Sequence, residues 1–433
     1  MSIEKKQRDI LIKSVSFINK NKIINKLSGL LYLNSWDSYS IGNTFLKFKI
    51  IGSISKWKFY GNFIKNLFAI RHLSNIKFKR KHSFFSNYNS IIFSWCKYSD
   101  FDNHGNYHDR YFNTCSKDNK DFLWFLISLD NKIPTNIDDN IQILFKGKAD
   151  FFSILNLFRK TIFIRREKLI SNSYERVFAN KIIKVLESSY IQNIKRIIQP
   201  YEAQPIQHAI NLSFQKYNIK TIGYLHSLLP PLPTDLIFRV GAPDILYIHG
   251  LGQIEIMNKF LNWNNNSLKF TKSFRFRKNN FLLSGNIFLP YDFSNDKVIF
   301  ESMEFFFKKS KLNSLPFLKI KSHPVKLNSS SHKKLIQSID FLINKYKSRF
   351  DSKNKTKFSI VIGASAVILE ALERDVETVI HIINNPTLES HQNFMWKKIN
   401  VEKINNNIYK YKLIKKKQYI HLGDNNLTLK NLI

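Results

Sequence analysis

Cysteines, long apolar runs and a secretory leader are what this sequence has least of. Only Cys96 and Cys115 occur among 433 residues, which excludes a disulfide framework and indicates a reducing compartment. No uninterrupted apolar run reaches the ~18 residues that suggest a membrane span, and the richest candidate, FSIVIGASAVILEAL, is shorter and contains Glu370. The N-terminal MSIEKKQRDILIKSVSF lacks a long apolar core and a small-residue cleavage site. We therefore expect a cytoplasmic protein, soluble or peripheral at the inner face of the membrane.

Common cofactor and metal motifs are also missing. There is no G-x-G-x-x-G and no G-x-x-x-x-G-K-[ST], so a dinucleotide-dependent oxidoreductase or a P-loop NTPase lacks its usual signature. One polar loop has the spacing C-x7-H-x3-H-x6-C, which fits no standard zinc pattern; its members are Cys96, His104, His108 and Cys115. Asp100 and Asp102 form an Asp-x-Asp pair in the same loop, which we interpret as solvated. We expect no bound metal and no cofactor.

Acidic residues are scarce: 68 Lys and Arg face 32 Asp and Glu, which gives a formal charge of +36. Such an excess favours anionic partners, namely nucleic acid, an inner-leaflet membrane surface or phosphorylated substrates. The lysines are spread throughout the chain, and no RNP, helix-turn-helix or zinc signature accompanies them. Binding of nucleic acid or another anionic polymer is therefore the alternative hypothesis rather than the leading one.

The chain is long enough for two domains, and 43% of its residues are hydrophobic. Alternating strand and helix patterns predict α/β architecture with parallel sheets and flanking helices, arranged as two Rossmann-like domains that face a cleft. We expect a basic, partly helical region at 1–85, a first domain at 86–235, a second at 236–385 and a polar tail at 386–433. The proline-rich SLLPPLPTD predicts a hinge near residues 227–241.

The stretch from Arg196 to Gly250 organises this prediction. RIIQPYE, AQPIQHAINLSFQKYN and IKTIGYLHS read as strand, helix and strand, a βαβ unit with parallel strands. Ligands of open parallel sheets bind beyond the carboxyl ends of the strands, where Glu202 and His226 follow two neighbouring strands. A carboxylate in a closed cleft can have a raised pKa and act as a general base. His226 is a competing base or the partner that orients Glu202; alternatively, Glu202 caps the helix and His226 is a core histidine.

Two further motifs lie in the second half. KIKSHP ends a predicted strand with Lys321, His323 and Pro324, which could offer a cation and an imidazole to a phosphate. GASAVILEAL opens a helix with Gly363 and Ser365, and a helix N-terminus presents free N–H groups to anions. Glu370, in that apolar helix, could accept hydrogen bonds from a ribose. The simpler interpretations are a solvated strand-to-loop turn, a helix cap and one exposed glutamate.

Together and in this order, GNYHDRYF, PYEAQPIQHAI, IGYLHS, APDILYIHG, KIKSHP and GASAVILEAL resemble bacterial surface-carbohydrate biosynthesis proteins, of capsule or O-antigen type, with a GT-B glycosyltransferase fold. The resemblance covers roughly residues 87–383. It implies an enzyme that transfers a sugar, or a polyol phosphate, from a CMP-, CDP- or UDP-linked donor to a glycan or lipid-linked glycan. A non-catalytic scaffold with the same fold is the other possibility that we consider.

The resemblance also implies roles for residues. The first half would bind the acceptor and the second half the nucleotide, without a metal ion. Glu202 would be the catalytic base, with His226 beside it. His323 and Ser365 would contact donor phosphate, and Glu370 the ribose or base. The full donor-binding set that we expect is Ser227, Gly285, Lys321, His323, Pro324, Gly363, Ser365 and Glu370.

Overall fold

The computed structural model describes residues 88–145, 193–278 and 282–433, with internal gaps of which the longest is 227–235, and a few isolated positions before and between these ranges. The expected N-terminal region 1–85 and residues 146–192 of the expected first domain lie almost wholly outside the described residues. Ser227 and Pro324 also lie outside them.

Within the described residues, the first sheet has eight strands. In spatial order it contains β1 (Lys77–Phe78), β6 (Ile141–Phe145), β5 (Leu123–Ser128), β2 (Ser90–Cys96), β7 (Arg196–Pro200), β8 (Lys220–Leu225), β9 (Ile245–Ile248) and β10 (Leu268–Phe270). Every neighbouring pair is parallel except β1 with β6. If the parallel strands β2, β5, β6, β7, β8, β9 and β10 are numbered 1 to 7 along the chain, their order across the sheet is 3-2-1-4-5-6-7. The first six follow the order of a Rossmann sheet, and the order of strands reverses between β2 and β7.

Local sequence explains these elements. β2 is buried at every residue but one and β5 at every residue, as expected for central parallel strands covered on both faces. The helix α8 (Pro205–Gln215) begins with proline at its first position, where the missing N–H would have no partner within the helix. A second helix, α9 (Leu251–Leu261), follows β9 and ends at Asn262, whose φ of 59° is left-handed.

The expected hinge does not separate the sheets. β9 follows residues 227–241, yet Leu225 of β8 pairs with Ile248 of β9, and β10 extends the same sheet. The prediction that a new sheet begins after the proline-rich segment is therefore wrong. The chain leaves the first sheet after β10, passes through β11 (Ser273–Arg277) and begins the second sheet at β12 (Asn286–Phe288).

The second sheet has six strands. In spatial order they are β13 (Lys319–Lys321), β12, β14 (Phe358–Ile362), β15 (Thr378–Ile382), β17 (Ile408–Leu413) and β16 (Ile399–Lys403). The helices are α10 (Asp296–Lys309), α11 (Ser330–Lys345) and α12 (Val367–Glu373). β12 to β15 pair in parallel, whereas β16 and β17 pair antiparallel. The segment expected to be a tail thus supplies two strands of this sheet.

Short elements complete the described chain. They are β3 (His108–Asp109), β4 (Thr114–Cys115), β18 (Leu422–Gly423) and the 3-10 turns η3 (Tyr98–Asp100), η4 (Ser116–Asn119), η7 (Asn265–Ser267), η9 (Lys347–Arg349) and η10 (Leu429–Leu432).

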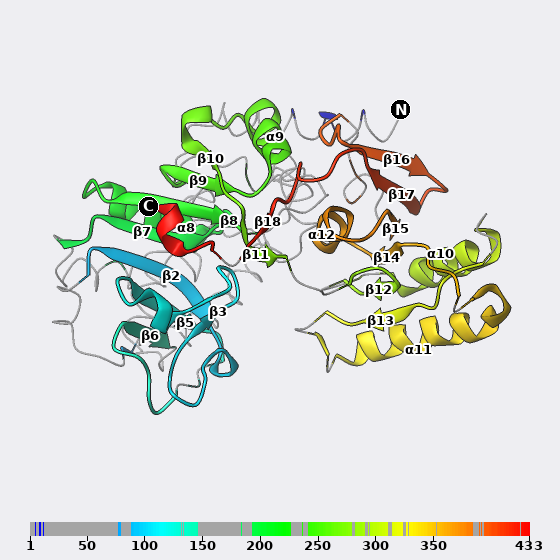
Figure 1. The fold of residues 1–433 in the computed structure, drawn as a ribbon, viewed down its shortest axis with the longest axis horizontal. Coiled ribbons are helices and arrows are strands. Elements are labelled where there is room, and N and C mark those ends of the chain that lie inside the picture. Colours follow the sequence, from blue (N-terminus) through cyan, green and yellow to red (C-terminus); the bar gives the residue numbers. More distant parts are fainter. Residues whose placement is uncertain are drawn as a thin grey trace, which may run out of the picture.

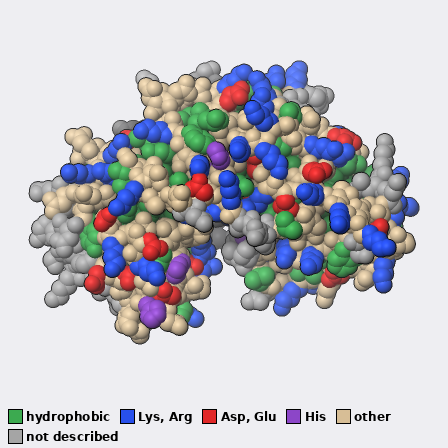
Figure 2. Space-filling view, viewed as in Figure 1, with side chains coloured by type: hydrophobic (Ala, Val, Ile, Leu, Met, Phe, Trp, Pro, Cys, Tyr) green, Lys and Arg blue, Asp and Glu red, His purple; other side chains and the backbone are tan. Residues whose placement is uncertain are grey.

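The molecule has two lobes, each built around one sheet (Figure 1). We call the eight-stranded sheet with α8 and α9 the first lobe, and the six-stranded sheet with α10 to α12 the second lobe. β2 and β8 run toward the second lobe, and α11, which follows β13, begins on the side nearest the first lobe (Figure 1). The carboxyl edges of the two sheets therefore face each other, and Figure 2 shows a notch between the lobes at the lower edge of the view.

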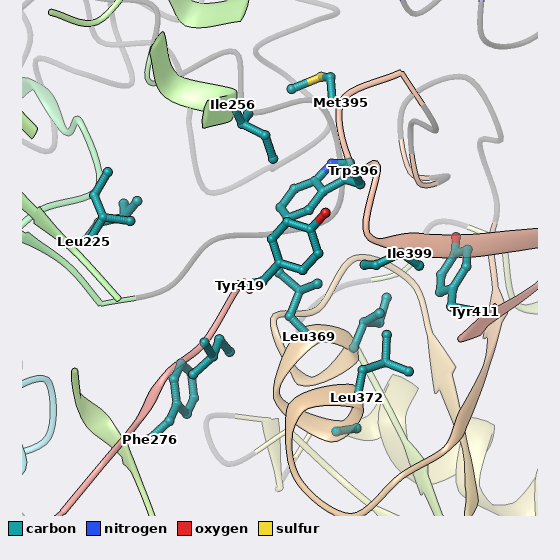
Figure 3. Packing of buried hydrophobic residues seen from close by; sticks show 14 of the residues in the cluster. Leu225, Ile256, Phe276, Leu369, Leu372, Met395, Trp396, Ile399, Tyr411 and Tyr419 are labelled. Carbon is teal, nitrogen blue, oxygen red and sulfur yellow. The ribbon is translucent and has the colours of Figure 1, made fainter. Parts of the chain in front are cut away.

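One hydrophobic cluster joins the lobes. It includes Leu225 and Ile256 from the first lobe and Leu369 and Leu372 from α12. Figure 3 shows Trp396 and Tyr419 between the two groups, and their rings lie 4.8 Å apart. The lobes are therefore connected by buried apolar surface as well as by the chain itself.

The C-terminal segment crosses from the second lobe back to the first. Glu373, at the end of α12, accepts hydrogen bonds from the backbone N–H groups of four successive residues, Lys417 to Ile420. The segment then passes so close to Gly250 that a Cβ there would lie 2.3 Å from the Tyr419 carbonyl oxygen. β18 pairs with β11, and Leu429 and Leu432 enter a core cluster of the first lobe.

Candidate active site

Glu202 and His226 meet at the carboxyl edge of the first sheet. Glu202 follows β7 and His226 follows β8, two neighbouring parallel strands. His226 Nε2 lies 2.9 Å from Glu202 Oε1. The Glu202 side chain is 33% exposed and the His226 side chain is 2% exposed. The structure therefore brings the two predicted residues together and leaves the carboxylate as the accessible member of the pair.

A tight turn holds Glu202 in place. Ala203 has a φ of 56°, which only a strongly constrained turn imposes on a residue with a side chain. Gln207 Oε1 accepts hydrogen bonds from the backbone N–H groups of Glu202 (3.0 Å) and Gln204 (2.9 Å). Gln204 Nε2 in turn donates to Glu202 Oε2 at 2.8 Å. The motif PYEAQPIQH thus builds the turn from its own side chains.

The charge of Glu202 is stabilised by its neighbours. Burial raises the pKa of its carboxyl, but the opposing effects of His226 and the Arg275 guanidinium, with a hydrogen bond from Gln204, bring the pKa below its ordinary value. The expectation of a raised pKa is therefore wrong, because a partly buried carboxylate with this many donors is favoured in its charged form. Glu202 is ionised at neutral pH and ready to accept a proton.

A loop after β2 covers His226 with an aromatic ring. The rings of Tyr111 and His226 meet edge to face, with centroids 4.7 Å apart. Asp109, fully buried nearby, positions this loop: it accepts hydrogen bonds from Ser94 Oγ (2.6 Å), Tyr107 Oη (2.7 Å) and the backbone N–H of Tyr111 (2.8 Å). The motif GNYHDRYF therefore supplies Tyr111, whose ring covers His226, and Asp109, whose carboxylate fixes the loop that carries Tyr111.

His249 and Tyr224 extend the site across the sheet. His249 follows β9 and is 0% exposed, and its Nδ1 lies 3.4 Å from Tyr224 Oη. Arg275 in β11 lies close enough to affect the pKa values of Glu202 and His249, and in the described part of the chain no carboxylate pairs with its guanidinium. Sequence reasoning missed Tyr111, His249 and Arg275. His249 could have been found, since it ends the strand after the one that carries His226.

The other predicted site residues lie in the second lobe. Lys321 and His323 come at the carboxyl end of β13, and Gly363 and Ser365 follow β14. Gly363 has a φ of 68°, and its carbonyl oxygen lies 2.7 Å from Nε2 of the buried His381. Ser365 Oγ accepts a hydrogen bond from the Val367 N–H at 3.2 Å. These residues are at the predicted edge of the sheet, although β12 lies between β13 and β14.

Gly285 is not at this edge. It precedes β12, and its N–H donates to the carbonyl of Phe358, the first residue of β14. Parallel strands place all their amino ends at one edge, so Gly285 lies at the edge opposite Lys321 and Gly363. It is therefore apart from the other residues of the predicted donor-binding set, and its φ of 72° serves the turn into β12.

Glu370 has a partner one turn further along the chain. Arg374, the residue after α12, places Nε 2.8 Å from Glu370 Oε1, and the two side chains are 8% and 16% exposed respectively. The pair has i,i+4 spacing but is largely buried. The apolar context that made Glu370 stand out reflects burial of α12 in the core between the lobes.

The loop with the Asp-x-Asp pair is held by protein contacts. Arg110 binds both oxygens of Asp100, at 2.6 and 2.5 Å. Asp102 accepts hydrogen bonds from the side chain of Asn106 and from the backbone N–H groups of Asn106 and His104, which lower the pKa of its carboxyl to about 2. Both cysteines are free and buried. Across the ranges that the structure describes, no group of three or more His, Cys, Asp and Glu residues is arranged to hold a metal ion.

An open depression of ≈ 850 Å³ lies at the other edge of the first sheet. It is lined by residues near the amino ends of β2 and β7, among them Asn89, Lys195 and Lys430. Glu202 and His226 are at the carboxyl edge, where ligands of open parallel sheets bind. We therefore do not assign the depression to the site.

Two histidines at these edges should make stability depend on pH. Burial lowers the pKa values of His249 and His381 to about 3. In the unfolded chain these histidines take up protons below pH ~6.5, whereas in the folded chain they stay neutral down to a much lower pH. Their contribution to the unfolding free energy is therefore fully present above pH ~6.5 and is lost as the pH drops toward 3. Each histidine should remove about 2 kcal/mol of unfolding free energy between pH 7 and 5. Urea unfolding at both pH values measures this. The buried His391, whose pKa burial also lowers, adds to the effect, so His249→Gln should remove only its own contribution of about 2 kcal/mol. Equal stability at both pH values would contradict the prediction.

Comparisons with known proteins identify no function for this chain. No protein family model matches the chain, and no curated protein matches it. Among solved structures, it is similar to a glycosyltransferase from Rickettsia africae ESF-5, with 10% sequence identity over 71% of this chain and 88% of that chain, at a TM-score of 0.35. This likeness is too distant to support a function. None of the described helices is long and apolar enough to cross a membrane.

Proposed function

We propose that this protein transfers a sugar, or a polyol phosphate, from a nucleotide-activated donor to a hydroxyl group of a glycan, in the synthesis of a surface polysaccharide. The observation that supports this most is the Glu202–His226 pair. An ionised, partly exposed carboxylate with a buried imidazole stands at the carboxyl edge of a parallel sheet with Rossmann order. That edge faces the carboxyl edge of a second parallel sheet (Figure 1).

The chemistry follows from the accessibility of the pair. The acceptor hydroxyl binds beside Glu202, which removes its proton as the oxygen attacks the anomeric carbon of the donor. The bond from that carbon to the nucleotide phosphate breaks, and the leaving phosphate keeps the electron pair. His226, which is buried, donates a hydrogen bond that holds the Glu202 carboxylate in position and stabilises its negative charge. For a polyol phosphate the same hydroxyl attacks phosphorus instead, and the nucleoside monophosphate leaves.

The second lobe supplies the donor side of this proposal. Lys321 is exposed at the carboxyl end of β13, where its ammonium can reach a phosphate, with His323 two residues further on. Gly363 and Ser365 form the turn into α12 at the neighbouring edge. Glu370, which lies in α12 beyond that turn, is the residue that we propose to contact the ribose. The donors that we propose are CMP-, CDP- or UDP-linked, and the acceptor is a glycan or a lipid-linked glycan at the inner face of the membrane.

Nucleotide binding tests the donor side. Lys321→Gln and His323→Ala should each weaken binding of CMP, CDP or UDP about 10- to 100-fold, because each removes a charged or polar contact with phosphate. Lys319→Gln is the matched control, since Lys319 is equally exposed on the same strand but at its amino end. Isothermal titration with the three nucleotides measures the affinities. If a nucleotide binds and all three variants bind it like the wild type, the proposed donor site is wrong.

The face shown in Figure 2 does not favour the nucleic-acid alternative. On this face Lys and Arg side chains are distributed over both lobes, with Asp and Glu side chains among them. A nucleic-acid-binding face would require a continuous basic stripe or patch.

A further inference from the structure

Three titratable residues form one row across the carboxyl edge of the first sheet. Pro200 of β7 pairs with Tyr224 of β8, so two residues further along Glu202 is level with His226. Leu225 of β8 pairs with Ile248 of β9, so one residue further along His226 is level with His249. Neighbouring strands lie about 4.8 Å apart. His226 is therefore next to Glu202 on one side and His249 on the other.

The hydrogen bond to Glu202 determines the tautomer of His226. An ionised carboxylate only accepts hydrogen bonds, so the His226 nitrogen that faces it, Nε2, carries the hydrogen. In the neutral imidazole Nδ1 then has a free lone pair. Within the described chain this atom is buried and has no hydrogen-bond partner. A buried acceptor in this position needs a donor.

The contacts of Tyr224 bear on the tautomer of His249. Tyr224 Oη accepts a hydrogen bond from the Phe274 N–H at 2.9 Å, and Ser273 Oγ accepts one from the Phe276 N–H. The Tyr224 and Ser273 hydroxyls lie 3.2 Å apart, and either can be the donor. With Ser273 donating to Tyr224, the Tyr224 hydroxyl donates to His249 Nδ1 and His249 Nε2 carries the hydrogen; we adopt this arrangement. His249 Nε2 too is buried and lacks a partner among the described residues.

We propose that His249 is a positioning residue for the Glu202–His226 pair, with its Nε2–H group hydrogen-bonded through one bound water molecule to His226 Nδ1. The two atoms are complementary, one a donor and one an acceptor, and they belong to adjacent positions of the row. A buried water molecule needs room and at least two polar partners, and these two nitrogen atoms would supply the partners. In this series of hydrogen bonds, Tyr224 donates to His249, His249 donates to the water molecule, the water molecule donates to His226, and His226 donates to the Glu202 carboxylate.

This series of hydrogen bonds keeps His226 in the tautomer that donates to Glu202. Without the donor at Nδ1, the hydrogen of the imidazole can occupy either nitrogen, and the carboxylate loses part of its stabilisation. The effect on the tautomer needs no substrate, whereas the effect on the rate rests on the proposed function. The two can therefore be tested separately.

A pair of substitutions isolates the Nε2–H group. His249→Gln places an amide N–H near the position of Nε2, whereas His249→Asn reaches only as far as Nδ1 and removes the donor. Nitrogen-15 NMR of histidine-labelled protein distinguishes the two ring tautomers, and the His226 signals are assigned with His226→Gln. We expect His226 to have hydrogen at Nε2 in the wild type and in His249→Gln, and mixed tautomers in His249→Asn. His332→Asn, which changes a buried histidine of the second lobe, should leave the signals unchanged.

Kinetics provide the second measurement once a donor is known. His249→Asn should lower kcat about 10- to 100-fold with KM nearly constant, and shift the acid limb of the pH profile upward, since a less stabilised carboxylate has a higher pKa. His249→Gln should restore the wild-type limb. His226 signals that are the same in wild type and both folded His249 variants would overturn the proposal, whatever the rates. If tautomers change as expected but no nucleotide sugar is turned over, the row stands and the proposed function fails.

Discussion

Replacing Glu202 with glutamine should lower turnover by about 10²- to 10⁴-fold, the loss typical of removing a general base. Glutamine keeps the shape of the side chain and can still accept a hydrogen bond from His226, but it cannot take a proton from the acceptor. The turn itself is fastened by Gln207 through backbone groups, so the fold and the affinity for the donor should be unchanged. Steady-state transfer and nucleotide titration on the same preparation measure both quantities.

The control for this substitution is Glu255→Gln. Glu255 is a half-exposed glutamate of α9 that lies 3.7 Å from Lys397, away from the Glu202–His226 pair. It should leave turnover unchanged. Because the pKa of Glu202 is lowered, the acid limb of the wild-type profile should lie below pH 4.5, the ordinary value for a glutamate. Transfer at the wild-type rate by Glu202→Gln would exclude Glu202 as the base, and a limb near neutrality would indicate a histidine instead.

Replacing Glu373 with alanine should destabilise the protein by about 3–5 kcal/mol, which is a large part of the stability of a typical domain. Glu373 is 5% exposed, and its carboxylate accepts hydrogen bonds from the N–H groups of Lys417, Gln418, Tyr419 and Ile420. Alanine leaves those donors without partners in a buried environment, and each such group costs roughly 1–3 kcal/mol when no water can reach it. Water can partly reach these N–H groups in the alanine variant, so the expected loss of unfolding free energy is smaller than the sum of the four separate costs.

Glu373→Gln provides a graded comparison. Its amide oxygen can still accept the three hydrogen bonds that reach Oε1, but its NH₂ group would face the Lys417 N–H, a donor against a donor. Its loss of unfolding free energy should therefore fall between those of wild type and alanine. Urea unfolding gives both values. An alanine variant as stable as wild type would mean that the crossing segment is held mainly by Tyr419 and Leu429 rather than by Glu373.

Much of the site could be predicted because parallel strands end at one edge. Once RIIQP and IKTIGYL are identified as consecutive parallel strands, Glu202 and His226 must lie near each other, and they do. The pKa of Glu202 could not be predicted in the same way. It depends on Arg275, which comes from β11, and no pattern in the sequence places that strand against the first sheet.

The two features that the sequence misplaced have a common cause. The segment FLLSGNIF, residues 281–288, has apolar residues before and after Gly285, so its pattern does not show that strand pairing starts only after the glycine. Likewise, the prolines of residues 227–235 indicate a stiff connection, but not whether the next strand joins the old sheet or a new one. Both facts depend on long-range pairing, here of β12 with β13 and of β8 with β9. Composition and periodicity describe a segment and not its partners.

The return of the C-terminal segment also has a consequence for synthesis on the ribosome. Leu429 and Leu432 fill a core cluster of the first lobe with Phe274 and Tyr224, yet they leave the ribosome after the whole second lobe. The apolar surface of the first lobe that Leu429 and Leu432 cover is therefore exposed while the second lobe is translated and folds. We expect the nascent chain to need a chaperone during that interval, and ribosome profiling with a captured chaperone would show occupancy from β11 until release.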